Sequence, residues 1–291
     1  MVQYLGQSMI VIILPTKEVN MTQNASKYII SKEYIEYLKR NCGVRGYDFE
    51  DKDDCCTRPD VDIIMQYITW LNIVADNKLL EVGCGLGRIL KEINHAYKIK
   101  PSGIDQFSEI IDEAKKRVSE ICDVIKVSSA ENIDFNTESF DKIICWGVFD
   151  LTNQILALKE MARILKLNGS LLLTGKNDTY ELDDKEAYLA EIASLKKGIP
   201  NHYSSIKTLI EMAKRFGLEM ERVRIFKKRG DLSNNRFIDG FCEKFYEYLL
   251  LFKKTEAIDY DIIHNLEKIG STRSKTGLEI ENDNLRINEY V

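Results

Sequence analysis

The chain has 291 residues, of which 44% are hydrophobic and 30% are charged, with a formal net charge of -5. This length allows one large or two small domains, and the composition is typical of a globular protein. The acidic balance disfavours a nucleic-acid partner, which would need a basic face for phosphate contacts, and we interpret the local run Lys227–Arg229 as a solvated strand end.

The seven cysteines are odd in number and lack Cys-x-x-Cys spacing, which favours reduced thiols in a cytoplasmic protein. No metal site is predicted, because the adjacent pair Cys55–Cys56 has no clustered histidine nearby. The apolar run Met9–Leu14 is too short to span a bilayer, and no Lys or Arg precedes it as in a secretory signal. The oligomeric state is left open.

Residues 1–76 are predicted to form an N-terminal extension and helical cap. Apolar residues recur at helical spacing over Lys27–Arg40 and again over Val61–Leu71, and a charged, turn-rich stretch separates the two segments. The tyrosines of the first helix, Tyr28, Tyr34 and Tyr37, could form a lid over a ligand, although such a stripe is more often the buried face of a cap.

From Lys78 onward, strand and helix signals alternate in a βαβ rhythm. This predicts a Rossmann-like, doubly wound α/β domain over 77–254, with an insertion at about 176–204 and a C-terminal tail over 255–291. Strands are expected at Leu79–Val82, Ser102–Asp105, Val124–Val127, Lys142–Trp146, Ser170–Thr174, Leu218–Phe226 and Tyr246–Phe252. Helices are expected at Arg88–His95, Glu109–Glu120, Gln154–Leu165, Lys185–Lys196 and Ile206–Phe216. The sheet would be seven-stranded and mostly parallel, with the last two strands antiparallel at one edge.

Several residues are predicted to begin or end these elements. Ser108 is a candidate N-cap for the helix that follows it. Gly169 and Gly217 are expected to adopt the positive φ that ends a helix. The tail is read as poorly packed, or as one extra helix around Tyr260–Ile269.

The most informative segment is Leu79–Arg88, in which an apolar strand ends in Glu81 and is followed by three alternating glycines. Such a turn exposes bare backbone N–H groups at a helix N-terminus, where a ligand can lie directly on them. The dinucleotide fingerprint would require glycine at position 88, where this chain has Arg88. Asp105 ends the next strand, and an acid there can accept both ribose hydroxyls of either a nicotinamide or another adenosine cofactor.

The Glu-x-Gly-x-Gly-x-Gly spacing resembles motif I of the class I S-adenosylmethionine-dependent methyltransferases. The run Ser129–Phe135, followed by Ser139–Asp141, resembles the loop Asp-Ala-x-x-Leu-Pro-Phe and Ser-Phe-Asp of the type-11 methyltransferase domain, a group that includes the ubiquinone/menaquinone C-methyltransferases. This chain departs from that pattern at Ser129, where the family has Asp, and at Asp134, where it has Pro. The resemblance extends to Lys159–Gly169.

The resemblance implies that S-adenosylmethionine is the cofactor. Glu81 would orient the loop and the methionine amino group, the glycines would allow close backbone approach, Asp105 would hold the ribose, and Trp146 and the residues after it would lie closest to the methyl group. The cofactor-binding residues implied in this way are Glu81, Gly83, Cys84, Gly85, Gly87, Asp105, Gln106, Ala130, Glu131 and Trp146. Ala130 and Glu131 would flank the adenine.

The residues that would act on the acceptor are less defined. Asp150 could be a general base, but an Asp that caps the following helix is the favoured reading. His202 could be a base, but an exposed loop histidine is favoured. Arg45 and Arg58 could bind an acidic substrate or form surface ion pairs.

The expected function is therefore a cytoplasmic methyltransferase that acts on a small molecule, with oxygen or nitrogen acceptors favoured over carbon on base rates. Two alternatives stay open. An NAD(P)-dependent oxidoreductase would share the fold and Asp105. A non-catalytic binding protein built on the methyltransferase fold would bind cofactor weakly or not at all.

Overall fold

The computed structural model describes residues 59–181, 183–196, 201–238, 240 and 242–258, together with short strands within 270–287. The predicted helix Lys27–Arg40, the run Met9–Leu14, the pair Cys55–Cys56 and the alternative tail helix Tyr260–Ile269 lie outside the described residues, as do Arg45 and Arg58. The proposed domain boundaries stay predictions.

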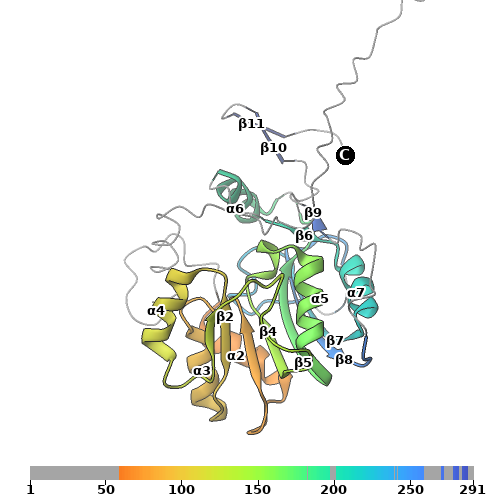
Figure 1. Cartoon of the computed structure of the whole chain (residues 1–291). Coiled ribbons are helices and arrows are strands. Elements are labelled where there is room, and N and C mark those ends of the chain that lie inside the picture. Colours follow the sequence, from red (N-terminus) through yellow and green to blue (C-terminus); the bar gives the residue numbers. More distant parts are fainter. Residues whose placement is uncertain are drawn as a thin grey trace, which may run out of the picture. The chain divides into compact units, whose positions relative to one another are not determined.

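A seven-stranded sheet forms the centre of the fold (Figure 1), in the order β3-β2-β1-β4-β5-β8-β7. Its strands are β1 (Leu79–Val82), β2 (Ser102–Asp105), β3 (Ile125–Val127), β4 (Phe140–Cys145), β5 (Leu165–Lys176), β7 (Leu218–Phe226) and β8 (Glu247–Lys254). Strands β1 to β5 are parallel, and β8 runs antiparallel between β5 and β7. The predicted doubly wound, mostly parallel sheet with an antiparallel edge is confirmed.

Helices cover both faces of this sheet. These covering helices are α2 (Val61–Ile68), α3 (Arg88–Tyr97), α4 (Ser108–Val118), α5 (Gln154–Ile164) and α7 (Ile206–Arg215), whereas α6 (Lys185–Lys196) lies beyond the end of the sheet (Figure 1). Single 3-10 turns are η1 (Thr69–Leu71) and η2 (Phe149–Leu151). Apolar residues of α2 and α3 pack with Leu172 and Leu249 of the sheet. Those of α5 and α7 pack with Leu171 and Leu250, which point to the opposite face. Successive residues of β5 and β8 thus serve two separate core layers.

Two predicted helix boundaries are wrong in detail. Phe107, not Ser108, is the N-cap of α4, and the Ser108 hydroxyl donates to the Glu109 carboxylate at 3.0 Å. The turn before the main part of β5 has its positive φ at Asn168 (64°), not at Gly169. Glycine is still needed at 169, because a Cβ there would lie 2.7 Å from Leu165 Cδ1. Gly217 does adopt the predicted positive φ, 74°.

The insertion after β5 contains α6 and the short strand β6 (Tyr203–Ser204). Asn177 bridges Ser204, so β6 lies beside the chain that leaves the carboxyl end of β5. In the tail, β9 (Gly270–Ser271) pairs with β6, and β10 (Leu278–Glu281) pairs with β11 (Asn284–Ile287). Among the described residues, none of the helices is both long and apolar enough to cross a bilayer.

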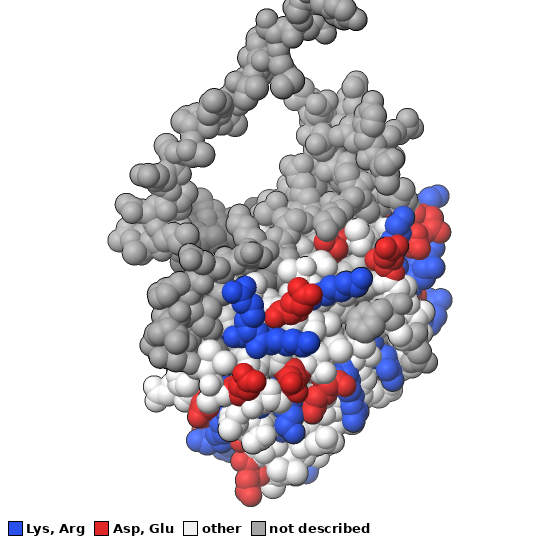
Figure 2. Space-filling model, turned by 90° about the vertical axis from the view of Figure 1, so that its right-hand side faces the viewer, with Lys and Arg blue, Asp and Glu red and all other residues white. Residues whose placement is uncertain are grey.

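Charged side chains of both signs share the surface drawn in Figure 2, where Lys and Arg lie next to Asp and Glu. Several exposed cations are paired with acids, such as Lys116 with Glu113 at 3.2 Å and Lys228 with Asp183 at 2.8 Å. On the described part of the face in Figure 2, Lys and Arg are interspersed with Asp and Glu, which suits a phosphate backbone less well than a purely basic area would.

Candidate functional site

The three alternating glycines form a left-handed turn between β1 and α3. Gly83, Gly85 and Gly87 have φ values of 75°, 53° and 82°, which side chains disfavour. The backbone N–H groups of Gly83 and Cys84 both donate to the Ile104 carbonyl, at 2.8 and 2.9 Å, and fasten the turn to β2. The predicted strand–turn–helix at the carboxyl ends of β1 and β2 is thereby present.

Tight packing also requires glycine at two of these positions. A Cβ at Gly83 would lie 2.4 Å from Val148 Cγ2, and one at Gly87 would lie 2.7 Å from Val118 Cγ2. Cys84 lies in the same turn, but its side chain is buried between α3 and α4, and burial raises the pKa of its thiol well above the usual value. Cys84 therefore offers backbone to this site and not a reactive thiol.

Glu81, in β1 just before the glycine turn, has an unusual buried carboxylate. Its side chain is 3% exposed, and Oε2 has no hydrogen-bond partner among the described residues. Burial raises the pKa of Glu81 well above its usual value, the Arg88 cation opposes this rise, and the Asp105 carboxylate adds to it. A buried acceptor without a donor is costly, so Oε2 marks a place where a ligand N–H group would fit.

Asp105 connects the glycine turn to the end of β2. Its two carboxylate oxygens accept from the backbone N–H groups of Gly85 and Phe107, each at 3.2 Å. Burial raises its pKa, and these hydrogen bonds act in the opposite direction. Asp105 thus holds the glycine turn in place, and its predicted contact with a ribose stays a prediction. The neighbouring Gln106 is exposed.

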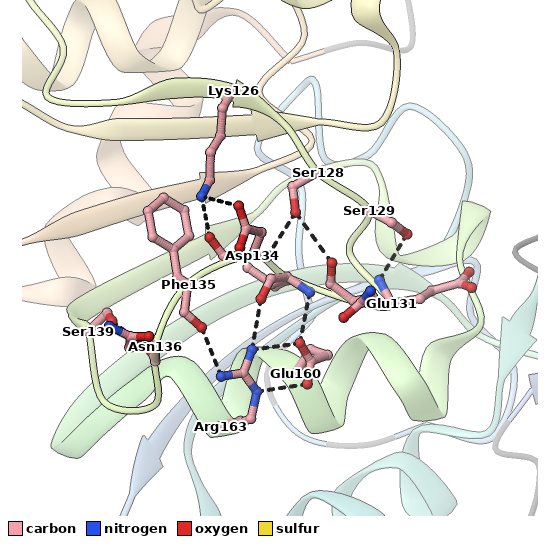
Figure 3. Close-up of polar contacts among 12 residues, drawn as sticks. Lys126, Ser128, Ser129, Glu131, Asp134, Phe135, Asn136, Ser139, Glu160 and Arg163 are labelled. Atoms are coloured by element: carbon pink, nitrogen blue, oxygen red, sulfur yellow. Dashed lines mark hydrogen bonds and ion pairs between the residues drawn. The ribbon is translucent and has the colours of Figure 1, made fainter.

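The loop after β3 holds the two departures from the family pattern, and Figure 3 shows how its polar groups are tied together. The Ser129 hydroxyl accepts from the backbone N–H of Glu131 at 3.2 Å. The backbone N–H of Asp134, which proline would lack, donates to Ser128 Oγ at 3.1 Å. Lys126 also pairs with the Asp134 carboxylate at 2.9 Å. The two departures are therefore accommodated by local hydrogen bonds.

Sequence reasoning missed the residues that anchor this loop to α5. Arg163 donates to the carbonyls of Phe135 and Ile133 at 2.9 and 2.8 Å, and it pairs with Glu160 at 2.7 Å (Figure 3). Glu160 in turn accepts from the backbone N–H of Ile133 at 2.8 Å. The available signal was the Glu-x-x-Arg spacing, which places both side chains on one helix face.

Ala130 and Glu131 lie within the anchored loop. Ala130 packs against the core layer of α5 and α7. Glu131 Oε1 accepts from the backbone N–H of Asn153 at 2.6 Å, and Asn153 is the N-cap of α5. The Glu131 carboxylate therefore contacts the start of α5, in addition to the contact with adenine that the family resemblance implies.

The segment after β4 faces the glycine turn through Val148. Trp146 is half-buried with its ring centroid 6.3 Å from that of Tyr67. Gly147 has a φ of 68°, and a Cβ there would meet no atom within 4 Å, in contrast with Gly83. The Gly147 N–H donates to Thr174 Oγ1 at 2.7 Å, which joins this segment to the end of β5. Space beside Gly147 is therefore open.

The favoured readings of Asp150 and His202 are both wrong. Asp150 does not cap α5, because Asn153 does so, and its buried carboxylate instead pairs with Lys176 Nζ at 2.7 Å. Burial alone would lower the pKa of Lys176, but the Asp150 charge raises it above the usual value. His202 is half-buried, not exposed, and its backbone N–H donates to the Asp150 carbonyl at 2.7 Å.

Comparison with known proteins agrees with this geometry. Residues 79–169 match the family model of the methyltransferase domain. The chain is 32% identical over 121 residues to an uncharacterized methyltransferase of Schizosaccharomyces pombe, covering 40% of this chain and 46% of that one. It is 32% identical over 101 residues to the human protein called probable tRNA methyltransferase 9B, covering 33% and 20%. The chain thus spans less than half of either relative.

A solved S-adenosylmethionine-dependent methyltransferase from Mesorhizobium loti shares the fold, with a TM-score of 0.51 and 14% identity over 67% of this chain and 100% of that one. Residues 79–169 are therefore similar to a methyltransferase domain, and the fold is the one that this S-adenosylmethionine-dependent methyltransferase has.

Proposed function

We propose that this chain transfers a methyl group from S-adenosylmethionine to a small-molecule acceptor that presents nitrogen or oxygen. The observation that carries the proposal is the partnerless, buried carboxylate oxygen of Glu81 beside the glycine turn. An ammonium group provides the donor and the charge that this oxygen lacks, and S-adenosylmethionine carries one on its methionine part.

The other predicted cofactor-binding residues suit the rest of that ligand. Asp105, already fixed by Gly85 and Phe107, would accept the ribose hydroxyls at the carboxyl end of β2. Ala130 and Glu131 would flank the adenine, in the loop that Arg163 anchors to α5. When bound, the sulfonium supplies an activated methyl group, so the protein's main task is to align the acceptor with it.

Calorimetric titration with S-adenosylhomocysteine and with NAD tests the cofactor. We expect S-adenosylhomocysteine to bind and NAD to bind far more weakly, because Arg88 stands where a dinucleotide turn needs glycine. Asp105→Ala and Gly85→Val should abolish binding of S-adenosylhomocysteine, and Glu120→Ala, at an exposed position, is the matched control. Tighter binding of NAD would favour an oxidoreductase, and no binding of either would favour a non-catalytic protein.

The acceptor class is tested by labelled transfer. With S-adenosylmethionine labelled on its methyl group, we expect label in a low-molecular-mass metabolite extract and none in total tRNA. The mixed charges of the face in Figure 2 support this expectation.

An RNA acceptor is the second candidate, supported by the human relative's name and by two arginines, Arg222 and Arg224, that lie over the half-buried Trp70 ring at 5.7 and 5.4 Å. Label found in tRNA alone would favour that candidate over a small molecule.

A further inference from the structure

A second group of charged residues lies at the carboxyl edge of the sheet, one strand beyond the loop after β4. Lys176, the last residue of β5, lies directly opposite Glu247, the first residue of β8. Residues paired in this way point to the same face of the sheet. Asp150, from the turn η2 after β4, joins them through its ion pair with Lys176. Three segments that are distant in sequence therefore bring two carboxylates and one ammonium together.

This group is continuous with the region proposed for methyl transfer. Gly147, with open space beside it, is fastened by its N–H to Thr174 Oγ1. Thr174 lies two residues before Lys176, and so on the same face of β5. Gly147, Thr174 and the opposed pair Lys176 and Glu247 therefore follow one another along one face of the sheet.

The three charged side chains differ in the ion pairs and hydrogen bonds that they form. Lys176 Nζ contacts Asp150 Oδ2 at 2.7 Å and donates to Asn201 Oδ1 at 2.9 Å. Asp150 is 5% exposed and held by this contact. The Glu247 side chain is half-buried, and the charges of Lys176, Asp150 and Arg229, not hydrogen bonds to described residues, act on its carboxylate. Glu247 is therefore the carboxylate that can receive a proton from a ligand, while Asp150 neutralises Lys176.

We propose that Glu247 accepts the proton of the methyl acceptor, which is an amine or a hydroxyl compound. The Asp150–Lys176 pair positions the Glu247 carboxylate for this step. The inference rests on the proposed function. The acceptor's nitrogen or oxygen lone pair forms a bond to the methyl carbon, and the carbon–sulfur bond breaks with its electron pair passing to sulfur. The proton displaced from the acceptor passes to the Glu247 carboxylate. Acceptors without such a proton, such as thioethers and tertiary amines, would gain nothing from Glu247.

The electrostatic surroundings suit this task. Burial raises the pKa of Glu247 to about 7, Lys176 and Arg229 lower it, and Asp150 raises it. Tyr246, the residue before Glu247, is also titratable, and burial raises the pKa of its hydroxyl. A base with a pKa near neutrality is effective at neutral pH, because much of it is ionised and its conjugate acid is not too strong. Transfer should accordingly increase as pH rises toward about 7 and then level off.

The test is the pH profile of label transfer from methyl-labelled S-adenosylmethionine into the low-molecular-mass extract. Glu247→Gln should lower the transfer rate about a hundredfold or more, as loss of a general base does. It should also remove the limb of the profile, that is, the increase in rate as pH rises toward about 7. Lys176→Met should move that limb to higher pH, because the cation that favours the ionised carboxylate is gone. Glu219→Gln, on the exposed part of β7, should match the unchanged chain.

Cofactor affinity separates this inference from the proposed function and from misfolding. Glu247→Gln should bind S-adenosylhomocysteine as tightly as the unchanged chain does, since Glu247 lies outside the glycine turn. An equal rate and an unaltered limb in Glu247→Gln would overturn the role of Glu247 while leaving the methyltransferase proposal intact. An unchanged chain that transfers nothing to the extract would contradict the proposed small-molecule activity itself, and this inference with it.

Discussion

At the scale of single residues, two acidic side chains beside the glycine turn affect the stability of the fold in opposite ways. Asp105 accepts hydrogen bonds from Gly85 and Phe107 and so holds the turn together. Glu81 is buried beside it with one oxygen unpartnered. A group that costs stability in the folded protein is retained most readily where a ligand uses it, so we expect the two residues to respond differently to substitution.

Glu81→Gln should stabilise the ligand-free protein at neutral and higher pH. Burial raises the pKa of Glu81 in the folded chain above its unfolded value, so its ionisation opposes folding as pH rises through the folded pKa. Below the unfolded pKa both states are protonated and this cost is absent. Thermal unfolding should therefore show a higher Tm for Glu81→Gln at about pH 8 and little difference at about pH 4.

The same substitution should weaken binding of S-adenosylhomocysteine by about tenfold or more, because a charge-assisted hydrogen bond to the ligand's ammonium group is lost. Glu120→Gln, at an exposed position of the chain, should change neither property. A lower Tm for Glu81→Gln at about pH 8 would mean that the carboxylate stabilises the fold, contrary to its partnerless oxygen.

Substitution of two glycines allows the stability cost of backbone strain to be measured apart from the cost of steric overlap. Gly83 and Gly147 both have positive φ, but only at Gly83 would a Cβ meet Val148. Gly147→Ala should cost about 1–2 kcal/mol from the left-handed backbone alone. Gly83→Ala should cost about 1–3 kcal/mol more from overlap. Urea unfolding would measure both costs, and Val148→Ala should restore part of the stability of Gly83→Ala but none of that of Gly147→Ala.

At the scale of elements, the loop after β3 shows how a departure from a family pattern can be accommodated. Proline at 134 would fix the backbone but would remove the N–H that donates to Ser128 Oγ. Asp134→Pro, the substitution that restores the family residue, should therefore destabilise this chain. Asp134→Ala is the matched control, because it loses the pair with Lys126 but keeps the N–H. The proline variant should unfold at a lower urea concentration than the alanine variant, and the reverse order would show that the hydrogen bond is dispensable.

Elements with a strong local signal were predicted to the residue. The buried runs of β1 and β2 gave the bounds that the structure has. Strand β5 is longer than predicted, since its backbone is already extended at Leu165, where α5 ends. That extension depends on pairing with Phe140 of β4, a contact between distant segments that periodicity does not report.

The candidate site likewise has parts that local sequence predicts and parts that depend on contacts between distant segments. The glycine turn and Asp105 were predictable because a strand, a turn and a helix N-terminus are contiguous in the chain. The Asp150–Lys176 pair was not predictable, because it depends on the order in which β4 and β5 lie in the sheet. A lone Asp before a helix looks like a cap from sequence, and only the position of Asn153 shows that the cap is elsewhere.

At the scale of the whole molecule, the sheet divides the core into two layers that support different parts of the site. Ile93 of α3 is fully buried in the layer behind the glycine turn. Leu158 of α5 is fully buried in the layer behind the loop that Arg163 anchors. Because the seven strands separate these side chains, we expect each layer to be perturbed without direct effect on the other.

Core substitutions test that independence. Leu158→Ala should lower the free energy of unfolding by about 2–5 kcal/mol, and Ile93→Val by about 0.5–1.5 kcal/mol, since each leaves a cavity in a filled layer. In the double variant the two losses should add to within about 0.5 kcal/mol, as they do for distant residues without shared partners. Urea unfolding of the four proteins measures the sum, and a larger coupling would show that the sheet transmits strain between the glycine turn and the loop after β3.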